Sequence, residues 1–177
     1  MTDQAITNTN QDSSTALAHI AGLLRPGGAI TQGDLAGLRR MDPRHPVPAF
    51  FKIEGLVLDE HLPGDAEARF DLETRWAAIV SGLAILGGLH QPGVRLGSAL
   101  VDAEYSELRF SRLMRSDVDR LADELPALAR FLAAKGVRAD WAGASQLILS
   151  AGTRREEEVQ RHIARDYYGA LSRHRSR

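Results

Sequence analysis

The chain has 177 residues, 44% of them hydrophobic and 25% charged, which is typical of a soluble globular protein with one compact domain or two small ones. It contains no cysteine, which excludes a disulfide framework, a thiolate nucleophile and a metal site with sulfur ligands. The formal net charge of −1 excludes bulk attraction of a polyanion, but residues 95–177 carry 15 basic and 12 acidic side chains, so local basic patches are expected there.

Residues 1–14 are polar and lack an apolar period, and we expect them to form a disordered, mobile tail. No basic segment followed by an apolar run opens the chain, so a cytoplasmic location is expected. A first helix is predicted from Thr15 to Arg25, with Leu17 and Ile20 on its apolar face, and the Pro-Gly-Gly sequence at 26–28 ends it.

The next segments complete a predicted N-terminal helical subdomain over residues 15–94. Thr31 and Asp34 have the spacing of a capping box, which predicts a short helix through Arg40. Three prolines in MDPRHPVP (41–48) indicate a turn that leads into residues 49–56. A central buried helix is predicted from about Asp71 to Gly87. Its apolar stretch, 76–89, is too short to span a bilayer, so no membrane association is expected.

Residues 90–94 are predicted to be a linker, because they contain Pro92 and Gly93 and the composition changes there. Downstream, helices are predicted over 96–103, over 106–117, over 118–135 after an Asp117 cap, over 141–150 after an Asp140 cap, and over 154–171 after a Thr153 cap. Runs with the alternation of a strand are absent. The sequence therefore predicts an all-α fold of two small helical bundles, 15–94 and 95–177, joined by a short linker.

The segment SELRFSRLMRSD (106–117) separates charge from apolar surface at helical spacing. Its three arginines cover an arc of about 120°, while three large apolar side chains occupy the opposite arc: these are Arg109, Arg112 and Arg115 against Phe110, Leu113 and Met114. A guanidinium keeps its charge at any working pH and matches phosphate oxygens. Periodicity alone, however, favours the simpler interpretation of a solvated helix face with ordinary surface arginines.

No catalytic or metal site is predicted, and no cofactor is expected. No histidine has another at i+3 or i+4, and no nucleophile pattern or phosphate-binding glycine loop occurs. The acidic residues at 117–124 open a helix, where carboxylates favour the positive end of the dipole. In the last helix, Glu157 can neutralise Arg161. Since only 6% of the residues are aromatic, a nucleic acid would be contacted through its backbone and not its bases.

Six short segments stand in a fixed order: LRR, a proline-rich gap with PAFFKI, RLGSAL, SELRFSRLMRSD, a helix opened by a Trp, and RDYYGAL. In this order they resemble the CasB family, the small subunit of the type I-E CRISPR complex Cascade, over roughly residues 35–171. The resemblance implies an all-helical, non-enzymatic protein of two subdomains, present as a pair in an RNA-guided complex. Its partners would be other Cascade subunits, the crRNA guide, and the target and displaced DNA strands of the R-loop.

The resemblance also implies which side chains bind nucleic acid. The matching positions are Arg39, Arg40, Arg95, Arg109, Arg115 and Arg130, and Arg112 fits the same face geometrically. The family pattern has a Trp a few residues before DYY, where this chain has His162 and Ile163, which leaves the role of the last helix open.

Two alternatives to nucleic-acid binding remain. The chain could be a helical scaffold whose arginines bind acidic proteins or pair within the fold, because Glu107 and Asp119 neighbour Arg109 and Arg115 in sequence. A metal-dependent nuclease ranks last, for want of clustered ligands.

Overall fold

Helices account for all the regular structure in the computed structural model, which describes the backbone of residues 2–176 and the side chains of residues 12–176. No strand occurs in this range, so the predicted all-α class is confirmed. The α-helices are α1 (Thr2–Leu23), α2 (Gln32–Arg40), α3 (Pro48–Ile53), α4 (Ala66–Leu86), α5 (Leu96–Asp102), α6 (Glu107–Leu113), α7 (Val118–Ala134), α8 (Ala142–Ser150) and α9 (Glu156–Arg175). A π-helical turn η1 (Glu54–Leu58) and two 3-10 turns, η2 (Asp59–His61) and η3 (Gly87–Leu89), complete the set.

Two helix starts coincide with predicted caps, at Thr31 and Asp117, whereas α8 begins after Trp141 and α9 after Arg155 and not directly after the predicted caps Asp140 and Thr153. The Thr31 side chain accepts from the Asp34 N–H and the Asp34 carboxylate bonds back to residue 31, which is the predicted capping box of α2. Asp117 caps α7 by accepting from the Arg120 N–H at 2.9 Å. The first helix differs, because it begins at Thr2 and not at Thr15. Among its side chains that are described, 12–23, the buried ones lie within the predicted range. The mobility of residues 1–14 stays a prediction.

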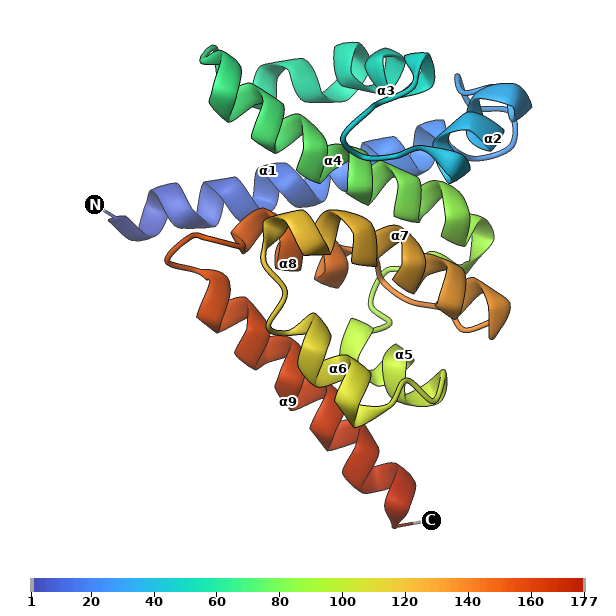
Figure 1. The fold of residues 1–177 in the computed structure, drawn as a ribbon, viewed down its shortest axis with the longest axis vertical. Helices are drawn as coiled ribbons and strands as arrows, with labels where there is room; N and C mark the ends of the chain where they lie inside the picture. The colour runs from blue at the N-terminus through green and yellow to red at the C-terminus, as the bar shows by residue number, and fades with distance from the viewer. Residues whose placement is uncertain (1, 177) are drawn as a thin grey trace.

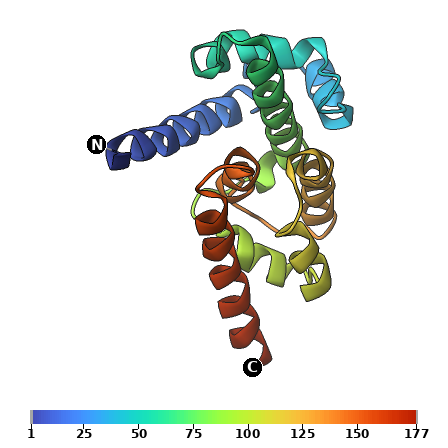
Figure 2. The same cartoon turned by 60° about the vertical axis from the view of Figure 1, so that its left-hand side comes forward.

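Helix α4 lies at the centre of the molecule and packs against α2, α7 and α8. Figure 1 shows α7 and α8 between α4 and the group formed by α5, α6 and α9. The segment Ala66–Leu89 is long and apolar enough to cross a membrane by length and composition, but 61% of its most apolar window is buried inside the protein. This segment is therefore the core helix. Figure 2 shows α1 projecting to one side and α9 downwards, so the two termini lie far apart.

Trp141 connects α4 with α8. Its ring is fully buried and its Nε1–H donates to the Ile79 carbonyl at 3.1 Å. Gly82 makes room for it, because a Cβ at that position would lie 2.2 Å from the Trp141 ring. The tryptophan that was predicted to open a helix is thus a core residue that packs between α4 and α8. It directly precedes α8, which begins at Ala142.

Helices α5 and α6 both pack against α9. Gly97 allows α5 to approach α9 closely, since a Cβ there would lie 2.5 Å from the Tyr167 backbone nitrogen. The Tyr167 ring stacks on Phe110 of α6 with centroids 3.9 Å apart, and its hydroxyl donates to the Tyr105 carbonyl at 2.6 Å. These contacts fix the orientation of α6 on the rest of the molecule.

The predicted linker is bonded to a distant segment. The Gln91 N–H donates to the Ala139 carbonyl at 3.0 Å, and the Asp140 N–H donates to the Val94 carbonyl at 2.7 Å. The Gly93 N–H donates to the Asp140 carboxylate at 2.8 Å. Buried side chains on both sides of this linker form one continuous cluster. The division into bundles at residue 94 stays a prediction.

Candidate nucleic-acid interface

Helix α6 presents its arginines to solvent as the periodicity predicts. Ser106 caps the helix by accepting from the Arg109 N–H, and Phe110 and Leu113 are buried against the core. Arg109 and Arg112 lie on the opposite face of the helix, and Arg115 lies in the turn that follows, because α6 ends at Leu113 and not at Asp117 as predicted. All three arginines are exposed. We call them the α6 arginines.

None of the α6 arginines pairs with a carboxylate among residues 12–176. The Arg115 Nη2 donates to the Ser111 hydroxyl at 3.0 Å, and the Arg109 Cζ lies 5.8 Å from the centre of the Phe131 ring. The side chain of Arg112 has no hydrogen bond or ion pair within the described range. A guanidinium over an aromatic face or beside a hydroxyl keeps its full charge, so the positive charge of this face is not neutralised by the fold.

Neither acidic neighbour of α6 pairs with the α6 arginines. The Glu107 carboxylate accepts from Arg175 of α9 at 2.6 Å. The carbonyl oxygen of Asp119 accepts from Arg44 at 2.6 Å, and its carboxylate forms no ion pair with Arg109 or Arg115. The geometry therefore offers no support for internal pairing of the α6 arginines.

A shallow depression of about 320 Å³ lies beside α6. Its lining is Leu108, Ser111, Arg112, Arg115 and Arg120. Sequence analysis did not single out Arg120, which belongs to the first turn of the next helix, α7. Its guanidinium is 68% exposed and pairs with Glu124 at 3.3 Å, so we expect a weaker contribution from it than from the α6 arginines.

A second group of predicted residues gathers at the end of α2. The Arg39 Nε donates to the Ala84 carbonyl of α4 at 2.9 Å, and the Arg130 Nη2 of α7 donates to the Arg39 carbonyl at 3.0 Å. Arg40 is exposed and its side chain has no described partner. Residues 130 and 131 of α7 connect this group to α6, because Phe131 is the ring beneath Arg109.

Arg95 lies apart from both groups. Its guanidinium pairs with Asp166 of α9 at 2.9 Å, and Asp166 also lies 3.6 Å from the His162 ring. It lines a separate groove with residues of α8 and α9. Since Arg95 remains 69% exposed, it can still meet an anion, but part of its charge is compensated.

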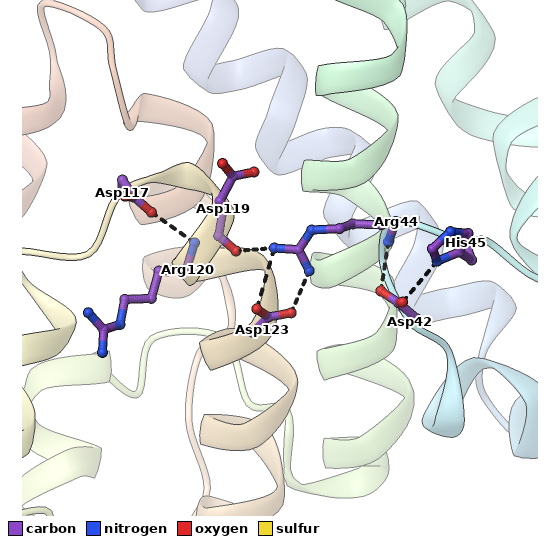
Figure 3. Close-up of polar contacts among 7 residues, drawn as sticks. All are labelled: Asp42, Arg44, His45, Asp117, Asp119, Arg120 and Asp123. Carbon is purple, nitrogen blue, oxygen red and sulfur yellow. Dashed lines mark hydrogen bonds and ion pairs between the residues drawn. The ribbon is translucent and has the colours of Figure 1, made fainter.

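The acidic start of α7 serves the fold, as Figure 3 shows. Arg44 reaches from the proline-rich loop to α7, where its Nη1 donates to the Asp123 carboxylate at 2.6 Å. Asp123 raises the pKa of this guanidinium through that hydrogen bond. The Asp42 carboxylate accepts from the Arg44 N–H and contacts the His45 ring, and these two contacts, that with His45 foremost, lower its pKa. The structure gives the acidic run a capping and pairing role, in line with the interpretation from its place at a helix start.

Comparison with known proteins gives two matches. The family model of the CRISPR-associated protein Cse2 matches residues 34–168. The crystal structure of M. ruber CasB superimposes with a TM-score of 0.58 at 21% sequence identity, covering 82% of this chain and 89% of that chain. Among curated proteins, none matches this chain. At this identity the structural likeness supports the fold, whereas the family match covers most of the chain.

Proposed function

Because the chain belongs to the CRISPR-associated Cse2 family, the family of CasB and of the Cascade small subunit, we propose that it stabilises the R-loop through a basic surface. In this proposal it is a non-catalytic, cytoplasmic protein that holds crRNA, the target DNA strand and the displaced strand. It is present as a pair in the complex, beside the other Cascade subunits.

The observation that carries the proposal is the uncompensated charge of the α6 arginines. Three exposed arginines lie on α6 and in the turn after it, and their acidic neighbour Glu107 already pairs with Arg175. Guanidinium groups suit phosphate oxygens, and contacts to the backbone give affinity without sequence preference. The adjoining group of Arg39, Arg40 and Arg130 extends the same chemistry towards α2.

Modest contacts are sufficient for this role. An RNA–DNA heteroduplex is about as stable as the DNA duplex that it replaces, so opening a target is a nearly balanced exchange. A few phosphate contacts to the separated strands therefore tip the balance towards the open state. The protein needs neither chemistry nor base readout for this.

The test is charge reversal on α6 within the assembled Cascade complex. The double variant Arg109→Glu/Arg115→Glu is expected to weaken binding of single-stranded DNA about tenfold or more and to reduce R-loop yield, because phosphate contacts become repulsions. The matched control is Arg154→Glu/Arg165→Glu, which makes the same charge change at exposed positions outside α6. Gel-shift titrations at two salt concentrations, with thermal unfolding as a check on the fold, measure the effect.

The alternatives give different results in the same assays. A scaffold without nucleic-acid binding yields no retarded species at either salt concentration, and equal losses in the double variant and its control assign the effect to net charge alone. Cleavage products in the presence of Mg²⁺ or Mn²⁺ contradict the non-catalytic part of the proposal.

A further inference from the structure

A cavity of about 330 Å³ is lined by residues from the end of α1, the side of α2 and the end of α4. Its size lies within the range of sites for small ligands. The aliphatic side chains of Leu24, Leu35 and Leu83 line it. Its polar lining consists of Arg25, Gln32, Arg39 and His90. The cavity thus combines an apolar body with a few convergent polar groups.

The charge of this lining has one sign. Two guanidinium groups line the cavity and no Asp or Glu does. The side chain of Arg25 has no hydrogen bond or ion pair among residues 12–176. Arg39 is held in place through its Nε, which donates to the Ala84 carbonyl at 2.9 Å, and its terminal nitrogens have no described partner. An anion is the complementary ligand, because a fixed guanidinium with free terminal N–H groups is ready to bind oxyanions.

His90 contributes its ring rather than a charge. Its Nδ1 accepts from the Trp141 N–H at 3.2 Å, which requires an unprotonated nitrogen. The groups that face it are Asp140 and Arg25, and burial is the larger influence, which lowers its pKa. A neutral imidazole beside aliphatic side chains suits a flat, uncharged body.

We propose that this cavity binds one nucleotide, with its phosphate on Arg25 and Arg39 and its base between the leucines and His90. The inference rests on the proposed function and names the unit of nucleic acid that this part of the surface receives. Continuity with the basic surface favours a nucleotide over other anions, because the Arg39 carbonyl accepts from Arg130 and Arg40 is the next residue. The nucleotide is either a free monophosphate or one unstacked unit of a bound single strand.

Two arms of one experiment separate these sources. In the first, calorimetric titration of the full chain with dAMP and with inorganic phosphate measures the free ligand. In the second, a thymidine oligonucleotide with a single 2-aminopurine reports entry of that base into the cavity, because its fluorescence rises when it leaves its stacked neighbours. A signal from the oligonucleotide without binding of dAMP assigns the cavity to a strand.

Two variants test the site itself. Ala21→Leu fills the cavity from its α1 wall, and Arg25→Gln removes an exposed, unpaired charge. Each is expected to weaken dAMP binding, or to reduce the 2-aminopurine signal, by about tenfold, whereas Arg154→Gln leaves both unchanged. Loss of the signal in these variants with strand binding retained supports the inference.

Three outcomes overturn it. If neither variant changes dAMP binding or the 2-aminopurine signal, the base binds elsewhere. If the wild-type chain binds dAMP and inorganic phosphate with equal affinity, the base makes no contact in the cavity. The third outcome is that a strand binds through the α6 arginines, but the wild-type chain gives no 2-aminopurine signal and does not bind dAMP. This result refutes nucleotide binding in the cavity and leaves the proposed function unaffected. If no strand binds, the proposed function is wrong, and the titration with dAMP still tests whether the cavity binds a nucleotide.

Discussion

Arg75 is an arginine whose charge the fold itself uses. Its side chain is only 12% exposed between α4 and α8, and its Nε pairs with Asp71 at 2.9 Å. Its Nη1 donates to the carbonyls of Ile148 at 2.9 Å and Ala151 at 2.8 Å, at the end of α8. Carbonyls at a helix end have no partner within the helix, so a cation there both bonds them and favours the helix dipole. Arg112, by contrast, has no hydrogen bond or ion pair within the described range, so the fold uses the charge of one arginine and leaves that of the other exposed.

Replacing Arg75 tests this structural role. Arg75→Met keeps the aliphatic stem but leaves the carbonyls at the end of α8 without a donor, which is expected to lower the free energy of unfolding by about 2–4 kcal/mol. Urea unfolding measures it. The exposed Arg154→Met is expected to change stability by less than about 0.5 kcal/mol. Equal effects in the two variants would show that the carbonyl contacts carry no stability.

His90 predicts a pH dependence of stability. Burial is the main cause that lowers the pKa of His90 in the folded chain from its ordinary value of 6.5. Below about pH 6.5 the unfolded chain therefore binds more protons than the folded chain, so the free energy of unfolding falls as pH decreases through this region and is level above it. His90→Asn keeps an acceptor for the Trp141 N–H but does not titrate. Between pH 7.5 and pH 5, the midpoint of urea unfolding should fall less for this variant than for the wild-type chain. If the midpoints of both proteins fall in parallel, His90 is not the cause of the pH dependence.

At the scale of elements, two glycines in helices have opposite surroundings. A Cβ at Gly97 of α5 would lie 2.5 Å from the Tyr167 nitrogen and 2.6 Å from the Ile163 carbonyl oxygen, both backbone atoms of α9. A Cβ at Gly22 of α1 meets nothing within 4 Å. Close approach of two backbones therefore requires glycine in α5, whereas in α1 glycine only adds flexibility to the unfolded chain.

This contrast gives a paired prediction. Gly97→Ala forces α5 away from α9 and is expected to destabilise the chain by about 1–3 kcal/mol through overpacking. Gly22→Ala is expected to stabilise it by about 0.5–1 kcal/mol through helix propensity. Thermal unfolding of both variants checks the signs. Stabilisation by Gly97→Ala would contradict the close α5–α9 contact.

Local capping signals located only some helix starts, because α4 begins after an Asp65 cap and not at about Asp71, and α8 and α9 do not begin directly after Asp140 and Thr153. The caps at Thr31, Ser106 and Asp117 each follow from a side chain and a backbone N–H three residues apart. The π-helical turn at Glu54–Leu58 has no such signal, because widening the helix depends on what packs around it. The early start of α1 at Thr2 also escaped prediction, since the segment lacks an apolar period.

The candidate site was predictable only within one helix. Three arginines at i, i+3 and i+6 define a face by spacing alone. The structure exposes all three, but only Arg109 and Arg112 lie in α6, and Arg115 lies in the turn after it. The contact of Arg130 with Arg39 spans 91 positions and the pair of Arg95 with Asp166 spans 71, so neither follows from local periodicity. These contacts depend on how α7 packs on α4 and α5 on α9.

At the scale of the whole molecule, the near-zero net charge conceals a sorting of charges. The carboxylates of Glu54, Asp59 and Glu73 surround Arg69. Arg44 of the proline-rich loop pairs with Asp123 of α7. These cations are thus used by the fold, while the α6 arginines have no carboxylate partner among residues 12–176. A protein with a net charge of −1 can therefore attract a polyanion locally without attracting it in bulk.

This sorting predicts how binding depends on salt. Each phosphate neutralised on a single strand releases counterions and contributes about −0.7 to the slope of log K against log salt concentration. Replacing Arg109, Arg112 and Arg115 together with Gln is therefore expected to make the slope shallower by about 2, and each single replacement by about 0.7. Fluorescence anisotropy with oligothymidine and with a mixed-sequence strand at four salt concentrations measures this. Because backbone contacts carry no sequence information, both strands should give the same slope. Arg154→Gln should leave it unchanged, and a triple variant with the wild-type slope would move the binding surface away from α6.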